Sequence, residues 1–292
     1  MVNVLKYRVI TGLFSCALML AFAGGALYKW YTRGSIFTYS VDFTGGTQFL
    51  LKFDKPIQSS VVKESLEQGG WQGVVIREFA PNEILVRVKE FAPDIKPLAD
   101  RICAAVQENT ACSVVVEQSE AVGAGVGEAL RWKSVWAVIY ALIAMLLYIA
   151  TRFWSFSFAI GAVIALFHDA IAMLAVFMFF DREISINVIG AILAVLGYSI
   201  NDTIVIFSKI RDNLRAINNA ALETVVEVSI SQTLTRSLLT SFTTALTVGA
   251  MFILGGEALR DFSLALLIGI VFGTYSSIYI ASPVMMLLYG KR

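Results

Sequence analysis

Two carboxylates stand inside stretches of sequence that are otherwise apolar. Asp202 lies within the apolar run Ile184–Phe207, beside Asn201, and Asp169 lies near the middle of the run Phe156–Phe180. An ionised carboxylate in the hydrocarbon core of a bilayer is costly unless it is paired, hydrated or protonated. Acids in such positions are typical of proton or ion pathways and of substrate sites, so both residues are candidates for proton transfer.

Polar residues near Asp202 strengthen this interpretation. Tyr198 precedes Asp202 by four residues and falls on the same face of a helix. If Lys209 marks the end of the span, Asp202 lies about 10 Å deep. Arg236 stands at the entrance of the next apolar run, at a comparable estimated depth. A polar stripe follows Arg236, formed by Ser237, Thr240, Ser241, Thr243, Thr244 and Thr247. Three alternatives stay open: Asp202 reaches water from a helix end, Arg236 is a simple anchor, and the stripe serves close helix packing.

His168 is the single histidine of the chain and stands beside Asp169. An imidazole could titrate near neutral pH and take part in proton transfer. However, neighbouring residues on a helix point about 100° apart, so the two side chains need not share one site. A structural hydrogen bond between helices is the alternative role for His168. With one histidine and no Cys-x-x-Cys pair, the sequence predicts no metal site.

The composition places these residues in a membrane. The chain has 292 residues, of which 57% are hydrophobic and 15% charged, and this excludes a disordered chain and most soluble folds. The net charge of +1 gives no reason to expect a nucleic-acid partner. A span needs about 20 apolar residues, and six runs qualify or nearly do: Val9–Tyr28, Ser134–Ala150, Phe156–Phe180, Ile184–Phe207, Ser237–Leu254 and Phe262–Tyr289. The sequence therefore predicts an α-helical membrane protein with six transmembrane helices.

The first run also has features of a signal peptide, since Lys6 and Arg8 precede it and Ala21-Phe22-Ala23 resembles a cleavage site. Its length favours a retained anchor. Orientation follows from the positive-inside rule. With the N-terminus inside, the cytoplasmic segments hold Lys6, Arg8, Arg152, Lys209, Arg211, Arg215, Arg236, Lys291 and Arg292, and the two short external loops hold Arg182 and Arg260. Both termini are predicted to be cytoplasmic, with an amphipathic cytoplasmic loop over 208–235.

The polar insert between the first two spans predicts one external domain over residues 34–120, after an N-terminal segment of residues 1–33. Its expected elements alternate as strand, helix, strand, strand, helix and strand: Thr47–Phe53, Ser59–Gln68, Val74–Phe79, Ile84–Lys89, Asp94–Gln107 and Ser113–Glu117. This βαββαβ order suits an α+β ferredoxin-like fold. The glycine-rich segment 121–133 predicts a flexible hinge to a five-helix transmembrane domain, residues 134–292.

Two smaller features of the external domain have structural interpretations. Asp42, Gly45 and Gly46 predict a tight turn just before the first strand, a structural role that we favour over ligand contact. Cys103 and Cys112 are candidates for a disulfide if the domain lies in an oxidising compartment. The alternative is that they are two small buried thiols.

Three segments together resemble the SecD/SecF family of bacterial protein-export membrane proteins, which belongs to the resistance-nodulation-division superfamily. The segments are Val41–Thr47, Gly197–Arg211 and Thr233–Thr244. His168-Asp169 and the hinge Val122–Leu130 also match, although Ala124 stands where the family usually has a proline. The resemblance covers nearly the whole chain, including the layout of six spans with one external domain.

This resemblance implies a subunit that is not an enzyme and has no cofactor, and that uses the proton-motive force. The implied location is the bacterial inner membrane, with the external domain periplasmic. The implied partners are SecD as a heterodimer, the SecYEG channel, YajC, a translocating preprotein and membrane lipid. Asp202 and Arg236 would form the intramembrane proton-pathway pair, with Asp169 as a further candidate. The supporting residues would be Tyr198, Asn201, His168 and Thr240.

Two other functions compete with this one. A proton-driven exporter of small molecules or lipids of the same superfamily has about twelve spans in one chain, whereas this sequence predicts six. An intramembrane aspartyl protease would use Asp169 and Asp202 together. Such proteases have a Gly-x-Gly-Asp sequence at one acid, and the residues before Asp202 do not fit it.

Overall fold

The computed structural model describes residues 5–80, 82–110, 112–217 and 220–289. The chain forms two compact units, one comprising the residues up to Thr38 together with those from Trp136 onward, and the other comprising Tyr39–Val135. These boundaries lie within a few residues of the domain limits at 34 and 134 expected from the sequence.

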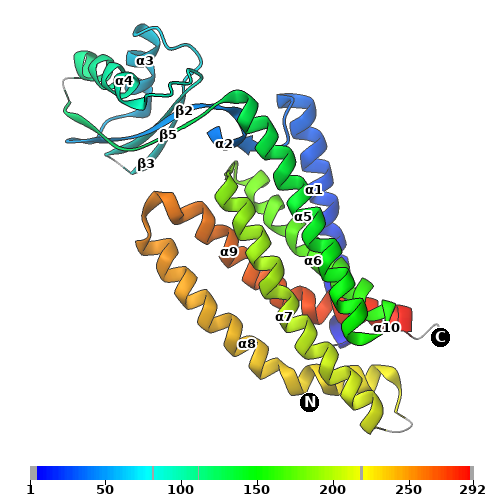
Figure 1. Cartoon of the computed structure of the whole chain (residues 1–292). Helices are drawn as coiled ribbons and strands as arrows, with labels where there is room; N and C mark the ends of the chain where they lie inside the picture. The colour runs from blue at the N-terminus through cyan, green and yellow to red at the C-terminus, as the bar shows by residue number, and fades with distance from the viewer. Residues whose placement is uncertain (1–4, 81, 111, 218–219, 290–292) are drawn as a thin grey trace. The chain divides into compact units, whose positions relative to one another are not determined.

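The first unit is a bundle of long helices (Figure 1). Its elements are η1 (Leu5–Tyr7), α1 (Arg8–Arg33), the later part of α5 (Ala124–Phe153), α6 (Phe156–Phe179), β6 (Glu183–Ile184), α7 (Ile186–Ala216), α8 (Leu222–Leu254), α9 (Gly256–Ser276), the π-helical turn η2 (Ser277–Ala281) and α10 (Ser282–Tyr289). Within the described residues, six helical stretches are long and apolar enough to cross a membrane. These six candidate helices correspond to the six apolar runs found in the sequence.

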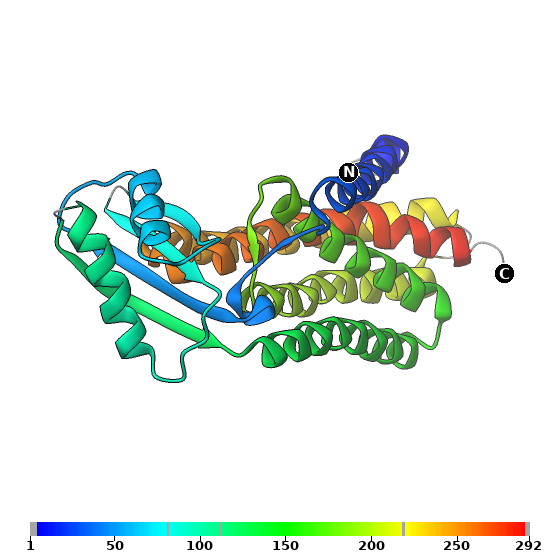
Figure 2. The ribbon, with the colours of Figure 1, turned by 90° about the horizontal axis from the view of Figure 1, so that it is seen from above.

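Helix α9 packs against α6, α7 and α8, so it lies at the centre of the bundle (Figures 1 and 2). The Gly-x-x-x-Gly spacing of Gly269 and Gly273 predicts such close packing, because small residues let helix backbones approach. A Cβ at Gly269 would come within 2.3 Å of Val195 Cγ2, and one at Gly273 within 2.9 Å of Ser199 Cβ. The prediction of a close helix contact is confirmed, and it brings α9 against α7.

The segment 208–235 differs from the loop expected there. Helix α7 continues to Ala216 and α8 already begins at Leu222, so most of the segment belongs to these two helices. The two extensions hold each other through buried Asn213, whose Nδ2 donates to Ser229 Oγ at 2.9 Å and to Gln232 Oε1 at 3.0 Å. Among the apolar residues that suggested a segment lying on the membrane surface, Ile210, Val225 and Val226 are buried.

One end of α1 is tied to the end of α6 by charged groups. Lys29 Nζ donates to Asp181 Oδ1 at 2.6 Å and to the backbone oxygen of Met178, and Arg33 Nη1 donates to Asp181 Oδ1 at 2.9 Å. The hydrogen bond from Lys29, followed by that from Arg33, holds the pKa of the Asp181 carboxyl below its usual range. Asp181 lies in the connection between α6 and α7, outside the candidate spans. Its carboxyl group is the group of this contact that titrates in acid.

We expect the stabilisation from this tie to depend on pH. Because folding lowers the pKa of Asp181, the stabilisation is complete above the ordinary carboxyl pKa of about 3.9 and is lost as the pH falls through the lower folded value. Thermal unfolding of the wild type and of Asp181→Asn should therefore differ at neutral pH and converge in acid. The difference will be modest, since the carboxylate is half exposed. A difference that grows in acid would contradict this assignment.

The second unit is a four-stranded antiparallel sheet covered by two helices. Its elements are β1 (Thr38–Tyr39, at the boundary), α2 (Val41–Thr44), β2 (Gly46–Phe53), α3 (Ser59–Gln68), β3 (Val75–Ala80), β4 (Glu83–Val88), α4 (Ile95–Thr110), β5 (Val114–Val122) and the beginning of α5. The strand order is β3-β4-β2-β5. All six segments expected from β2 to β5 form the expected type of element, and β5 extends five residues further than predicted.

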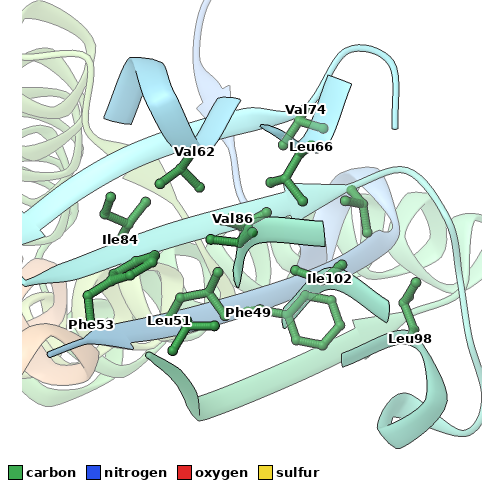
Figure 3. Packing of buried hydrophobic residues seen from close by; sticks show 13 residues of the cluster. Phe49, Leu51, Phe53, Val62, Leu66, Val74, Ile84, Val86, Leu98 and Ile102 are labelled. Carbon is green, nitrogen blue, oxygen red and sulfur yellow. The ribbon is translucent and has the colours of Figure 1, made fainter. Parts of the chain in front are cut away.

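The core of this unit lies between the sheet and the two helices (Figure 3). Phe49, Leu51 and Phe53 alternate along β2 and place their side chains on one face, as the period of two requires. They meet apolar residues of α3 and α4, among them Leu66 and Ile102, which are fully buried. A single hydrophobic face on each element is therefore enough to assemble the unit.

We expect Phe49→Ala to destabilise this unit by about 3–5 kcal/mol, because the ring is fully buried and its removal leaves a cavity. Pulse proteolysis of the purified full chain in urea would measure the change. Val115→Ala on β5 is the matched control, since Val115 is 64% exposed and should cost little. Equal losses for the two variants would contradict the assigned core.

The backbone geometry of the turn before β2 explains which residue types occur there. Ser40 Oγ donates to Asp42 Oδ2 at 2.9 Å, and the hydroxyl of Thr44 donates to the Ser40 carbonyl at 3.0 Å. Gly45 and Gly46 have φ values of 74° and 109°, which favour glycine, and a Cβ on Gly46 would lie 2.5 Å from the Val88 oxygen. This geometry is consistent with the structural turn expected from Asp42, Gly45 and Gly46.

The hinge expected over 121–133 is largely regular structure. Strand β5 includes Ala121 and Val122, and α5 begins at Ala124, which leaves Gly123 between them. Gly127 has a packing role, since a Cβ there would lie 3.0 Å from the backbone carbon of Phe43 and 3.1 Å from the oxygen of Asp42. Gly127, one of the glycines that suggested a flexible coil, therefore allows α5 to pass close to the backbone of the turn before β2.

Cys103 and Cys112 are free thiols in the structure, so the candidate disulfide is not formed. Both side chains are partly buried and pack against the hydrophobic core of the second unit. Burial, followed by the charge of Asp100, raises the pKa of the Cys103 thiol. Both cysteines therefore fit the alternative to a disulfide, in which they are small thiols that pack against the core.

Candidate functional site

Asp169 is fully buried at the place where α6, α7 and α9 meet. Its Oδ2 accepts hydrogen bonds from Ser199 Oγ of α7 at 2.7 Å and from Ser276 Oγ of α9 at 2.9 Å. Its Oδ1 lies 3.5 Å from Nδ1 of His168. The carboxyl group therefore has polar partners from two other helices, and it joins three spans at one point.

The hydroxyl groups continue beyond Asp169 along α7 and η2. Ser277 Oγ lies 2.8 Å from Thr203 Oγ1 and also contacts the backbone oxygen of Ser199 at 3.3 Å. Ser277 begins the π-helical turn, and such turns frequently occur at functional sites. Sequence reasoning missed Ser199, Ser276 and Ser277. The Ser276-Ser277 pair in an otherwise apolar span is the signal that could have pointed to them.

Asp202 lies three residues beyond Ser199, about one turn along α7. Its side chain is 5% exposed and faces the hydroxyls of Ser237 and Ser241 on α8. In the part of the chain that the structure describes, Asp202 Oδ2 and Ser237 Oγ are buried without a hydrogen-bond partner. Ser241 Oγ, by contrast, lies 2.6 Å from Thr274 Oγ1 of α9. Asp169 of α6 therefore contacts α7 through Ser199, about one turn from Asp202, and each acid lies close to a hydroxyl that is on α9 or contacts it.

Arg236 and Asp202 do not form the ion pair that their estimated depths suggested. The charge of Arg236 acts on Asp202, but Arg236 is exposed, and among the described residues no ion pair joins the two. Asp202 is buried where α7 meets α8, whereas Arg236 is exposed although its neighbour Ser237 on α8 is buried. In this arrangement Asp202 and Arg236 are close enough for their charges to interact, but an ion pair between them would require a movement of side chains or helices.

The supporting residues divide into those that join the site and those that do not. Tyr198 Oη donates to Thr244 Oγ1 at 3.3 Å, which links α7 to α8 beside Asp202. Asn201 is exposed. Thr240 is exposed as well, and its hydroxyl donates to the backbone oxygen of Arg236 at 3.0 Å. The polar stripe of α8 is therefore split, with Ser237 and Ser241 buried toward Asp202 and the threonines mostly on the outside.

Carboxyl and hydroxyl groups at these positions can take up, hold and release protons. A buried carboxylate is either ionised at a cost or protonated, and serine and threonine hydroxyls can donate as well as accept hydrogen bonds. No group of three or more metal-ligating side chains occurs within the described ranges. The fold and the site thus define a multi-pass membrane protein with buried acids between its spans.

Comparison with known proteins assigns the family. Residues 102–291 match the family described as "Protein export membrane protein SecD/SecF, C-terminal", and residues 37–57 match the "SecD/SecF GG Motif", which contains Gly45 and Gly46. The chain belongs to the SecD/SecF family of protein-export membrane proteins.

Its relatives include two proteins named protein translocase subunit SecF. That of Thermodesulfovibrio yellowstonii is 39% identical over 256 residues, which cover 86% of this chain and 83% of the relative. That of Pseudomonas aeruginosa is 39% identical over 265 residues, which cover 90% and 85%. Identity at this level over nearly whole chains supports a common fold and organisation.

Solved structures agree with this assignment. SecDF of Thermus thermophilus, described as a translocon-associated membrane protein, matches with a TM-score of 0.84 and 34% identity over 98% of this chain. This chain spans 38% of that longer SecDF chain. A SecDF structure in a "super-membrane-facing form" matches 98% of this chain with a TM-score of 0.68 and 33% identity.

Proposed function

We propose that this chain is a subunit of the bacterial Sec protein translocase that acts with SecD and uses the proton-motive force to assist preprotein export. The observation on which the proposal depends is buried Asp202 on α7, facing the hydroxyls of α8 with Arg236 close by. The family assignment supports it, because relatives that match most of this chain are named translocase subunits. We propose no enzymatic step and no cofactor.

The physical basis of the coupling is the charge of Asp202. An ionised Asp202 attracts Arg236 and the hydroxyl donors of α8, and protonation removes that attraction. Because Arg236 is exposed here while Asp202 is buried, the two can pair only if side chains or helices move. Proton uptake and release would therefore favour different arrangements of α7 and α8. The proton acts here as a ligand that shifts the population toward the conformation that binds it better.

Asp169 is proposed as a second proton-handling group. It contacts α7 and α9 directly through Ser199 and Ser276, so a change in its protonation would change the contacts among three spans. Ser199, which donates to Asp169, lies about one turn from Asp202 along α7, so the same helix contacts both acids. A proton that binds at either acid would therefore alter the position of α7.

We further propose that the second unit is a ferredoxin-like periplasmic domain, that both termini are cytoplasmic and that the membrane is the bacterial inner membrane. The order of β2 to β5 and the sheet order β3-β4-β2-β5 support the fold name.

The proposed partners are SecD, the SecYEG channel, YajC and the preprotein in transit. Pairing with SecD is supported by SecDF proteins, which match this chain with a part of their length. Affinity purification of the tagged chain from its native membrane should recover SecD as the main partner. Recovery of the chain without any SecD would contradict the proposal. The alternative of a small-molecule or lipid exporter is not favoured, since the matched relatives are named as protein translocase subunits.

A further inference from the structure

A cavity of about 970 Å³ lies in the helix bundle between α1, α6, α10 and the first turn of α8. Its volume is at the upper end of the about 300–1,000 Å³ that is usual for small-molecule sites. Most of its wall is apolar. Neither Asp169 nor Asp202 is on that wall, although His168, the neighbour of Asp169, is. Gly12 and Cys16 are on the α1 side of this cavity.

Two opposite charges lie on the wall of the cavity at the ends of two spans. Arg8 Nη1 and Glu223 Oε1 are 2.6 Å apart, and their side chains are 46% and 61% exposed. Arg8 begins α1 and Glu223 is in the first turn of α8. The ends of spans are where lipid headgroups meet the hydrocarbon core. The cavity therefore has one cation and one anion at headgroup level.

The length of the cavity matches that of an acyl chain. Its α1 wall extends from Arg8 to Leu20, a separation of about 18 Å at the helical rise. One leaflet of the hydrocarbon core is about 15 Å deep, half of the about 30 Å total. On α6 the wall extends inward to His168. An apolar cavity of this kind does not hold water well, whereas hydrocarbon fills it without loss of hydrogen bonds.

We propose that this cavity binds one phospholipid whose headgroup contains both a phosphate and a primary ammonium, as in phosphatidylethanolamine. The phosphate would accept hydrogen bonds from Arg8, which has further N–H donors beyond the one given to Glu223. The ammonium would donate to the carboxylate of Glu223, and one acyl chain would lie along α1 toward His168. A purely anionic headgroup would leave Glu223 facing a phosphate, and a choline headgroup has no N–H to donate. The inference requires only that the chain spans a membrane, and does not depend on the export function.

Gly12 provides the test. A Cβ there would meet nothing within 4 Å, so Gly12→Leu fills the cavity without a backbone clash. Gly24 on the same helix is equally open but is not on the wall of the cavity, so Gly24→Leu is the matched control. The full chain would be reconstituted in bilayers of equal phosphatidylethanolamine, phosphatidylcholine and phosphatidylglycerol, extracted, and measured by native mass spectrometry. We expect one retained phosphatidylethanolamine per chain, at least a tenfold loss in Gly12→Leu, and wild-type retention in Gly24→Leu.

A second experiment tests the headgroup and uses no substitution in α1. Glu223→Gln should remove the preference for phosphatidylethanolamine over phosphatidylcholine. Cys16 is a free thiol on the cavity wall, and its alkylation in wild-type vesicles should be several times slower when phosphatidylethanolamine is present than when it is absent.

Three results would overturn the proposal: equal retention of the three lipids by the wild type, unchanged retention in Gly12→Leu, or a lipid-free complex with SecD in which Cys16 cross-links to SecD. The last result would assign the cavity to a helix of the partner.

Discussion

Asp202→Asn is expected to abolish proton-dependent export while leaving membrane insertion and SecD binding intact. Asparagine keeps the size and hydrogen-bonding oxygen of the side chain, so the packing of α7 against α8 should survive. It can neither ionise nor bind a proton, so the charge that attracts Arg236 and the buried hydroxyls is lost in every state. Preprotein release from vesicles, compared with and without an imposed proton gradient, would measure the effect. The variant should show the same slow release under both conditions.

The matched control is Asp212→Asn, which makes the same change on the same helix at a side chain that is 63% exposed. It should release preprotein at the wild-type rate. Arg236→Met should lose the response to the gradient as Asp202→Asn does, because it removes the other charge. Arg236→Lys should retain part of the response, since lysine preserves the charge but not the planar geometry. Normal gradient-driven release by Asp202→Asn would sink the assigned role of Asp202.

Asp169→Asn is the second change with a large expected effect. Its amide oxygen can still accept from Ser199 and Ser276, so the three helices should stay together, but proton binding at this position is lost. If Asp169 handles protons, the response of export to the gradient should fall sharply without a change in thermal stability. Asp169→Leu should also destabilise the bundle, because two buried hydroxyls lose their acceptor at a cost of about 1–3 kcal/mol each.

The double variant Ser199→Ala and Ser276→Ala separates the two roles of this site. It removes both hydroxyl donors and retains the carboxyl group, so a purely structural hydrogen-bond role predicts lost stability with a normal response to the gradient. Asp169→Asn with a normal response would show that Asp169 only joins helices. Thermal unfolding and vesicle release would be measured on the same preparations, so that stability and coupling are compared directly.

Much of the fold could be predicted because it depends on local patterns. The six spans follow from the length and composition that a bilayer demands of each segment. The elements of the second unit follow from the alternation of residues such as Phe49, Leu51 and Phe53, which sets one buried face on a strand. The spacing of Gly269 and Gly273 likewise indicates a close helix contact, although it does not say which helix is the neighbour. In each case the signal lies within one segment of the chain.

The site was only partly predictable, for a physical reason. Asp169 and Asp202 were evident because an acid in an apolar run is conspicuous at any rotation of its helix. Their partners were not, because a span that is apolar on all sides does not reveal which face meets a neighbour. Ser199 and Ser276 come from different helices and meet at Asp169 only after α6, α7 and α9 pack.

The sequence by itself predicted six segments apolar enough to cross a membrane, one polar domain and two acids within the apolar segments. Only the tertiary structure decided that Asp202 is buried while Arg236 is exposed, that α7 and α8 extend through 208–235 apart from the short connection between them, and that α1 leaves a cavity beside His168. These features depend on the rotation and separation of helices, which are set by contacts between residues far apart in the chain. Local hydrophobicity determines whether a segment enters the membrane, and packing between segments determines what each of its side chains meets there.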